Sequence, residues 1–257
     1  MKITEPVLSA PTWAELGTSD PKAAAAFYGR VLGWRAETDL RPEAGGYTRL
    51  LLDDDPVAGL VPHQAAGQPV AWTFSVAVAD ADGTAGEVRK AGGTVLLDPT
   101  DVLDLGRYAV IADPGGAVLT LWEARTFRGA ARLNEPGALC WVELATRDTA
   151  AAEAFYGSVF GWSAEGGPYV HWGVGGRNFG GMVRMDERYP EGAPPHWTLY
   201  FAVLNVDAAV NTATEAGGSV GYPAMDIPGT GRVAGLYDPQ GGAFAVYTPE
   251  GVARTEP

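Results

Sequence analysis

Two glutamates, Glu15 and Glu143, occupy the same place in two copies of one sequence pattern, each two residues after a tryptophan. A carboxylate flanked on a strand by indole loses hydration, which raises its pKa and suits it to act as an acid or a base. A second interpretation pairs each glutamate with an arginine, such as Arg49, Arg107 or Arg232, in a structural ion pair. The sequence leaves both interpretations open.

The second copy of the pattern holds more groups that can transfer a proton, because His171, His196 and Tyr200 accompany Glu143. Histidine titrates near neutral pH, although a single histidine is more often a packed or surface residue. The candidate acid and base residues are therefore Glu143, His196, Tyr200 and Glu15. Cys140 lies in an apolar stretch and is expected to be a buried, inert thiol.

Strand alternation adds candidate ligand-binding residues on the same face as the two glutamates. Ala14 and Leu16 are expected to meet helices, so Trp13 and Glu15 face the opposite, concave side. The same argument, strand by strand, selects Trp13, Tyr47, Arg49, Thr73, Trp122, Trp141, Tyr169, His171, Thr198 and Tyr247. Aromatic walls with few polar groups suit a flat organic ligand held by stacking. The other interpretation is that Trp13 and Trp141 are simply core residues.

The pattern that carries these residues is an internal duplication. WAELGTSDPKAAAAFYGRVLGW (13–34) recurs as WVELATRDTAAAEAFYGSVFGW (141–162), and GRYAVIADPGGAVLTLW (106–122) recurs as GRVAGLYDPQGGAFAVY (231–247). A period of this length predicts two homologous modules, over residues 1–125 and 138–257, joined by residues 126–137.

Each half predicts the same order of elements. A strand ends at Asp20 or Asp148, each of which can cap a helix that ends at Gly33 or Gly161. On the first helix, the apolar residues Ala23, Phe27 and Val31 are spaced along one face. Further strands and a second helix follow, so each module is predicted to contain two consecutive βαβββ units. The predicted fold class is α+β, with a curled mixed sheet around a cavity in each module and helices on its other face.

These motifs resemble the vicinal oxygen chelate superfamily, which includes glyoxalase I, extradiol dioxygenases, fosfomycin-modifying enzymes and bleomycin-binding proteins. The resemblance rests on the Asp-capped helix ending in FYGxVxGW, on AGG, and on the GR…DPxG segment, in both halves. Within that superfamily the chain looks like the tandem glyoxalase-like bacterial proteins labelled as hydroxylases or antigens, some of them associated with antibiotic biosynthesis.

The resemblance also implies where a metal would bind. Metal-binding members carry His, Gln or carboxylate ligands at positions that correspond here to Trp13, Thr73 and Thr120 in the first half and to Trp141, Thr198 and Ala245 in the second. Indole does not ligate metals, and a threonine hydroxyl is a poor ligand on its own. We therefore expect no metal site and no cofactor.

Composition narrows the functional classes further. The 257 residues include 18 Lys+Arg against 31 Asp+Glu, a net charge of −13, which disfavours nucleic acid and anionic membranes as partners. One cysteine excludes an internal disulfide, and three histidines leave few imidazole ligands for a metal. The absence of an apolar run of about 18 residues predicts a cytoplasmic protein.

These observations predict a protein that binds an aromatic or amphipathic small molecule, such as a secondary metabolite, without the family metal site. The alternative is a metal-independent enzyme, for an isomerase, lyase or hydroxylase-linked step, that uses Glu143 with a histidine or tyrosine. A divalent-metal glyoxalase or dioxygenase is less favoured. The two modules are expected to pack on each other, so that the chain is either a pseudo-dimeric monomer or part of a homodimer.

Overall fold

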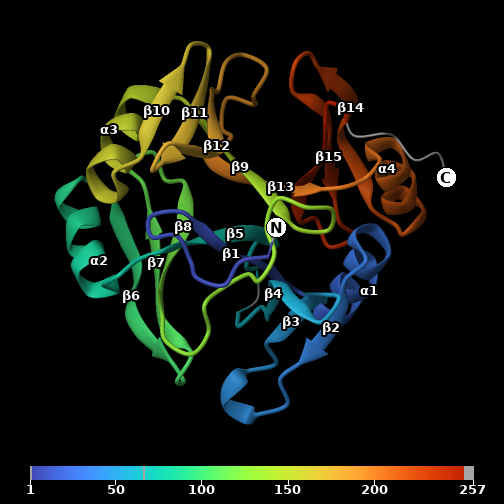
Figure 1. The fold of residues 1–257 in the computed structure, drawn as a ribbon, viewed down its shortest axis with the longest axis horizontal. Helices are drawn as coiled ribbons and strands as arrows, with labels where there is room; N and C mark the ends of the chain where they lie inside the picture. Colours follow the sequence, from blue (N-terminus) through green and yellow to red (C-terminus); the bar gives the residue numbers. More distant parts are fainter. Residues whose placement is uncertain (1, 66, 252–257) are drawn as a thin grey trace.

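The computed structural model describes residues 2–65 and 67–251 and shows two modules of the same architecture (Figure 1). The first contains β1 (Pro11–Thr18), α1 (Pro21–Leu32), β2 (Arg35–Thr38), η1 (Pro42–Ala44), β3 (Thr48–Leu52), β4 (Asp55–Pro62), β5 (Ala71–Ala77), α2 (Ala81–Lys90), β6 (Thr94–Val102), β7 (Gly106–Ala112) and β8 (Val118–Ala124). The second contains β9 (Leu139–Thr146), α3 (Thr149–Phe160), β10 (Ser163–Gly166), β11 (Tyr169–Val174), β12 (Arg177–Arg184), β13 (His196–Ala202), α4 (Val206–Glu215), β14 (Ser219–Ile227), β15 (Gly231–Tyr237) and β16 (Ala243–Pro249). The predicted α+β fold class is confirmed.

Each module forms one eight-stranded mixed sheet that curls without closing into a barrel. The strand orders are β2-β3-β4-β1-β5-β8-β7-β6 and β10-β11-β12-β9-β13-β16-β15-β14, so two βαβββ repeats meet at β1–β5 and at β9–β13. Residue patterns in the sequence do not predict the positions of β2, β10, β6 and β14. Every residue of β2 and β10 is exposed, and β6 and β14 are mostly exposed, so none of them shows the alternation of apolar residues that marks a half-buried strand.

The first helix of each module begins and ends where the sequence predicts. The Asp20 and Asp148 side chains accept hydrogen bonds from the amides of Ala23 and Ala151, 2.9 and 3.0 Å away. Gly33 and Gly161 end the helices with φ of 76° and 70°, a left-handed conformation that suits glycine.

The buried face of α1 differs from the prediction by about one residue. It consists of Ala24, Phe27, Tyr28 and Leu32, whereas Ala23 and Val31 are only half-buried. Tyr28 has a polar hydroxyl and was therefore not predicted on the buried face. It is nevertheless fully buried, because its hydroxyl forms hydrogen bonds within the core.

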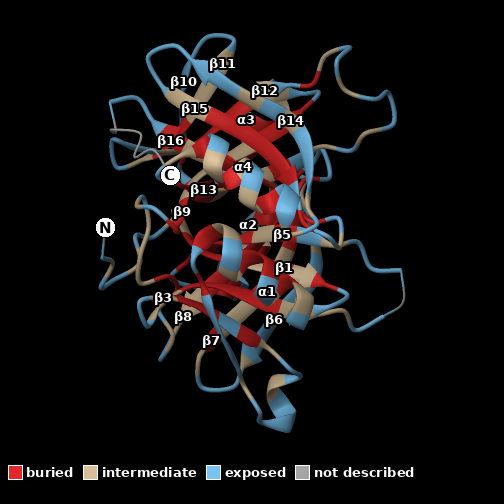
Figure 2. Ribbon diagram, turned by 90° about the vertical axis from the view of Figure 1, so that its right-hand side faces the viewer, coloured by how far each residue is buried: buried red, intermediate tan, exposed pale blue. Residues whose placement is uncertain are grey.

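The helices lie in two pairs on opposite sides of the molecule in Figure 1, and the central strands β5 and β13 contact each other between these pairs. In the pairs, α1 packs on α4, and α2 packs on α3. One continuous core runs through both modules; its residues are the buried segments at the centre of Figure 2. Ring pairs cross the interface, with centroids 5.0 Å apart for both Trp72–Phe201 and Phe74–Trp197. The concave faces of the sheets therefore point away from each other, toward opposite ends of the molecule.

Two equivalent hydrogen-bond chains tie the modules together through this core. The Trp72 indole N–H donates to the Tyr28 hydroxyl over 2.8 Å, and this hydroxyl donates to Asp238 Oδ2 of the second module over 2.9 Å. In the reverse direction Trp197 donates to Tyr156 over 3.2 Å, and Tyr156 donates to Asp113 Oδ2 of the first module over 3.0 Å. We call these the two Trp–Tyr–Asp chains. Both aspartates are 3% exposed, so neither carboxylate has water as a substitute partner.

No helix in residues 2–65 or 67–251 has both the length and the apolar character needed to cross a membrane.

Substitution of Tyr28 or Tyr156 by phenylalanine should lower the free energy of unfolding by about 1–3 kcal/mol, because each change leaves a buried carboxylate and a buried indole N–H without their shared partner. The effects of the two variants should be similar. Urea denaturation provides the measurement, and Tyr237→Phe, at a tyrosine that is 43% exposed, is the matched control. A Tyr28→Phe variant as stable as this control would contradict the importance of the chain.

Candidate functional site

The concave face of the first sheet brings two of the predicted residues, Tyr47 and Trp13, together around Glu15. The Tyr47 hydroxyl donates to Glu15 Oε1 over 2.7 Å and accepts from the Trp13 indole N–H over 2.9 Å. No hydrogen bond to Glu15 Oε2 is formed by the residues of the described chain. Glu15 therefore has one oxygen tied to the protein and one available to a ligand.

A glycine on the neighbouring strand makes room for this arrangement. Gly59 of β4 pairs with Glu15 of β1, and the Tyr47 ring crosses directly over it. A Cβ at this position would lie 2.1 Å from the tyrosine hydroxyl. In the second module, Gly181 pairs with Glu143, and a Cβ there would also lie 2.1 Å from the Tyr169 hydroxyl. Glycine at these positions is therefore a steric requirement for the tyrosine–glutamate contact.

The second module repeats the cluster and extends it. Tyr169 accepts from the Trp141 indole N–H over 2.8 Å and donates to Glu143 Oε2 over 2.9 Å. The other carboxylate oxygen, Oε1, accepts from Tyr200 over 3.0 Å, and Tyr222 donates to the Tyr200 hydroxyl over 3.3 Å. Both oxygens of Glu143 are thus bonded to tyrosines, unlike those of Glu15.

The electrostatic environment favours the neutral form of both glutamates. Burial raises the pKa of Glu15 above its usual value, and the hydrogen bond from Tyr47 and the nearby Trp13 indole N–H offset only part of this effect. Burial likewise raises the pKa of Glu143, against the opposing effects of Tyr169, Tyr200 and the charge of His196. Burial also raises the pKa of the Cys140 thiol to about 12, so this cysteine is protonated at neutral pH.

The ion-pair interpretation of the two glutamates is wrong, because the three arginines considered for it are paired elsewhere. Arg49 contacts Glu37 at 3.1 Å. Arg107 contacts Asp82 and Asp101 at 2.7 and 2.9 Å, and Arg232 contacts Asp207 and Asp226 at 2.7 and 3.1 Å. All of these pairs lie toward the exposed edges of the sheets, where an ion pair retains water and costs little desolvation. Tyrosines, which bring no charge, take their place at the two partly buried glutamates.

A cavity of about 460 Å³ opens over Glu15. Its lining includes Trp13, Tyr47, Arg49 and Trp122 from the predicted set, and also Tyr108, Phe127, Asp39, Arg41 and Leu103. These last five were not among the residues predicted from the sequence. Alternation along β7 would have found Tyr108, because Ala109 and Ile111 beside it are buried in the core. Phe127 lies in the segment between the modules, and no strand periodicity identifies it.

The other predicted residues lie on the expected faces of the sheets, but they differ in how close they come to Glu15 or Glu143. Thr73 and Thr198 pair across the strands with Glu15 and Glu143. The His171 ring lies 5.1 Å from the Tyr169 ring, centroid to centroid, beside the Glu143 cluster. His196 is exposed, and its Nδ1 lies 2.9 Å from the Pro194 carbonyl.

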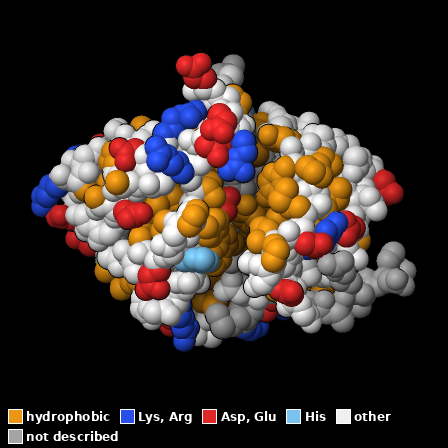
Figure 3. All heavy atoms as spheres, turned by 90° about the horizontal axis from the view of Figure 1, so that it is seen from above, with side chains coloured by type: hydrophobic (Ala, Val, Ile, Leu, Met, Phe, Trp, Pro, Cys, Tyr) orange, Lys and Arg blue, Asp and Glu red, His pale blue; other side chains and the backbone are white. Residues whose placement is uncertain are grey.

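Tyr247 donates to the Thr230 carbonyl over 2.8 Å and packs against the buried cluster of Tyr200, Val233 and Ala245. In Figure 3 the second module is viewed from above. A hollow with hydrophobic walls and a histidine at its edge separates the β10–β12 side from the β14–β15 side.

The positions that carry metal ligands in the family do not fit a metal here. Trp13 uses its N–H on Tyr47, and the Thr120 hydroxyl is 2.7 Å from that of Ser75 and donates to the Phe74 carbonyl over 3.1 Å. In the second module the corresponding residues are Trp141, Thr198 and Ala245. Within residues 2–65 and 67–251, no group of three or more His, Cys, Asp or Glu side chains is placed to hold a metal ion. The donor set at these positions thus lacks both imidazole and carboxylate.

Each module is one curled sheet built from two βαβββ repeats, which is the architecture expected of the vicinal-oxygen-chelate fold. The chain belongs to the Glyoxalase/Bleomycin resistance protein/Dioxygenase superfamily, whose family profile matches residues 11–121 and 138–246. This confirms the resemblance drawn from the repeated motifs.

Similar proteins and structures agree with this assignment. Anthracycline biosynthesis protein DnrV of Streptomyces peucetius is 38% identical, with 92% of each chain covered. CFP32 of Mycobacterium tuberculosis, provisionally named a glyoxylase, is also 38% identical, covering 93% of this chain and 94% of its own. The 2,3-dioxygenase LapB of Pseudomonas sp. KL28 shares the fold, with a TM-score of 0.67, 17% identity, and 99% of this chain and 97% of LapB covered.

Substitution of Gly59 by alanine should displace Tyr47 from Glu15 and lower the free energy of unfolding by about 1–3 kcal/mol, because the new methyl group overlaps the tyrosine hydroxyl and removes a buried hydrogen bond. Gly181→Ala should act in the same way at Glu143. Gly17→Ala is the matched control, since a Cβ there would find its nearest neighbour at an ordinary 3.9 Å. Equal urea denaturation midpoints for Gly59→Ala and Gly17→Ala would contradict the steric requirement.

Proposed function

We propose that the first module binds a flat, polycyclic aromatic small molecule of the anthracycline class in the cavity over Glu15. The observation that carries this proposal is the form of the cavity: about 460 Å³, with Trp13, Trp122, Phe127, Tyr47 and Tyr108 around one available carboxyl oxygen. This volume is within the range of drug-sized ligand sites, and aromatic walls favour stacking with a flat ligand.

The chemistry of the polar groups fits such a ligand. A carboxyl group whose pKa is raised by burial keeps its proton at a higher pH than an exposed one, so Glu15 Oε2 can donate a hydrogen bond to a quinone or ketone oxygen. Tyr47 holds the other oxygen in place. Two relatives that are 38% identical over nearly the whole chain, DnrV and DauV, are named as anthracycline biosynthesis proteins, which supports this choice of ligand.

Binding in this proposal does not use a metal. The side chains at the family's ligand positions are indole, hydroxyl and methyl groups, whose hydrogen-bonding atoms are occupied by protein partners at Trp13 and Thr120. The ligand would be held by stacking and by one or two hydrogen bonds. The rim of the cavity adds Arg41 and Arg49, each already paired with a carboxylate, Asp39 and Glu37.

Daunorubicin binding should weaken about ten-fold as the pH rises through the raised pKa of Glu15, because the ionised carboxylate can no longer donate a hydrogen bond and repels a carbonyl oxygen. Glu15→Gln, whose amide still donates, should remove this pH dependence. Fluorescence titration from pH 5 to pH 9 measures both. Glu143→Gln is the matched control and should retain the wild-type profile; a profile changed by Glu143→Gln and not by Glu15→Gln would contradict the placement of the site.

A second candidate function is proton transfer at Glu143. The observation in its favour is the hydrogen-bonded series Tyr222–Tyr200–Glu143, which leads from the half-exposed Tyr222 to a carboxyl group of raised pKa. Such a series can pass a proton between the carboxyl group and a ligand at Tyr222. It differs from the first module, where no such series reaches Glu15.

If Glu143 transfers a proton, Glu143→Gln should abolish conversion of an anthracycline substrate while binding is retained, because the amide cannot take up or release the proton. Product analysis by chromatography after incubation, beside the titration above, separates these effects. Tyr222→Phe should reduce conversion by a smaller factor. Unchanged conversion in Glu143→Gln would remove this residue from the reaction and leave binding as the function.

A further inference from the structure

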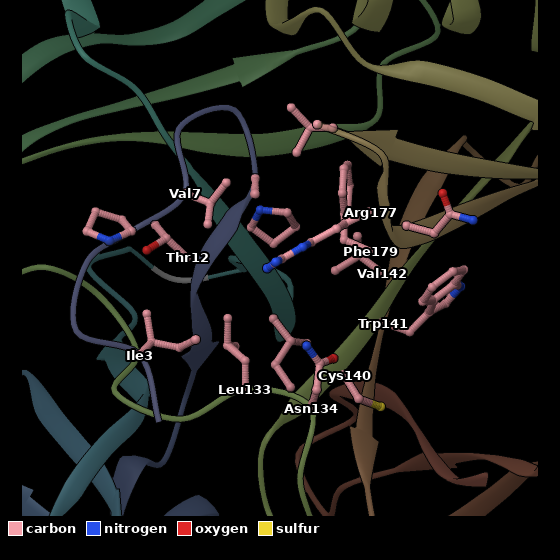
Figure 4. Close-up of a pocket in the computed structure, with 17 residues that line it drawn as sticks. Ile3, Val7, Thr12, Leu133, Asn134, Cys140, Trp141, Val142, Arg177 and Phe179 are labelled. Carbon is pink, nitrogen blue, oxygen red and sulfur yellow. The ribbon is translucent and has the colours of Figure 1, made fainter. Parts of the chain in front are cut away.

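A second cavity, of about 410 Å³, lies where the two modules join, away from the cavity over Glu15 (Figure 4). Five parts of the chain form it: the N-terminal segment, the start of β1, the segment between the modules, β9, and the β11–β12 hairpin. Most of its wall is aliphatic, from Ile3, Val7, Leu133, Leu139 and Val142. Trp141 and Phe179 complete the side toward the second module (Figure 4).

One cation, the exposed side chain of Arg177, borders this apolar space. Figure 4 shows the Arg177 side chain extending from the start of β12 into the cavity. Arg177 forms no ion pair with any of residues 2–65 or 67–251. No aspartate or glutamate is present among the lining residues. In a chain with a net charge of −13, this is a local site of the opposite sign.

The first module shows that this charge is not a consequence of the repeated fold. Arg177 stands four residues before Gly181, and the residue four positions before the equivalent Gly59 is Asp55. Asp55 is neutralised by Arg132 and Lys2, at 2.8 and 3.3 Å. The second module thus carries the reverse charge at this place, without a counter-charge in the described chain.

Neutral side chains near Arg177 can also donate hydrogen bonds to a bound anion. Asn134 lies at the edge of the cavity in Figure 4 and has φ of 58°, a left-handed conformation that its backbone N–H secures by donating to the Leu139 carbonyl over 3.0 Å. Asn134 and Asn178 both line the cavity with exposed side chains. Arginine and carboxamide N–H groups are donors, and together they match a carboxylate.

We propose that the junction cavity binds an aliphatic carboxylate, with its carboxylate on Arg177 and its hydrocarbon chain among Ile3, Val7 and Leu133. The predominance of branched aliphatic side chains over flat aromatic surfaces favours an alkyl chain, whose burial supplies most of the affinity. Arg177 supplies the preference for the anion over a neutral molecule of the same shape. This site is independent of the cavity over Glu15 and of the function proposed for it.

Isothermal titration of the full chain with decanoate tests the proposal, with decanol as the neutral probe of equal length. We expect saturable binding of one decanoate per chain, at least ten-fold tighter than that of decanol. Arg177→Gln should reduce decanoate affinity about ten-fold and leave decanol affinity unchanged. Arg184→Gln is the matched control, because Arg184 is an exposed arginine at the other end of β12, outside the cavity.

Val7→Trp provides an independent test that does not alter charge. Val7 is 57% exposed, so a larger side chain should fill the cavity mouth without disturbing the core, which thermal denaturation checks. It should abolish binding of both probes, whereas Glu15→Gln should leave both unchanged. Equal decanoate affinity in wild type and Arg177→Gln, equal affinity for decanol and decanoate, or no saturable binding would each overturn the proposal.

Discussion

The two Trp–Tyr–Asp chains at the module interface are the constraint on which the rest of the structure depends. In each chain, a tyrosine on a helix of one module donates a hydrogen bond to an aspartate carboxylate in a turn of the other module. Each of these aspartates is 3% exposed. A carboxylate buried to this degree is tolerated only when its oxygens are bonded. Asp238 meets this requirement with Tyr28 at Oδ2 and the Gln240 and Gly242 amides at Oδ1. The modules therefore cannot separate without exposing their core and unpairing these groups.

This interface determines where ligands can bind. The helices and the apolar faces of both sheets are used between the modules, whereas the concave face over Glu15 and the seam beside the N-terminal segment hold cavities for small molecules. On each concave face, a glycine lies beneath a tyrosine whose hydroxyl forms a hydrogen bond with a glutamate. The two copies have then diverged: Glu15 keeps one available oxygen beneath a cavity, whereas Tyr200 occupies the corresponding oxygen of Glu143.

Much of the fold and part of the candidate site could be predicted from residue patterns. Ala14 and Leu16 lie in the core, with Trp13 and Glu15 on the opposite face, because side chains alternate along a strand. The partners of Glu15 and Glu143 could not be predicted, since tyrosine and arginine are both suitable donors and the choice depends on which strand passes beside the carboxyl group. The cavity wall formed by Phe127 was missed because it comes from a segment without periodicity.

The sequence by itself determined the duplication, the helix caps at Asp20 and Asp148, and the loss of metal-ligand residues at the family positions, because these depend on residue types and on spacings within one short segment. Only the tertiary structure decided that Tyr28 bonds an aspartate 210 positions away and that Asp55 and Arg177 face equivalent places with opposite charges. The physical reason is that hydrogen bonds and charge pairing act over a few ångströms in space. Which residues come within that distance is set by how the two modules pack.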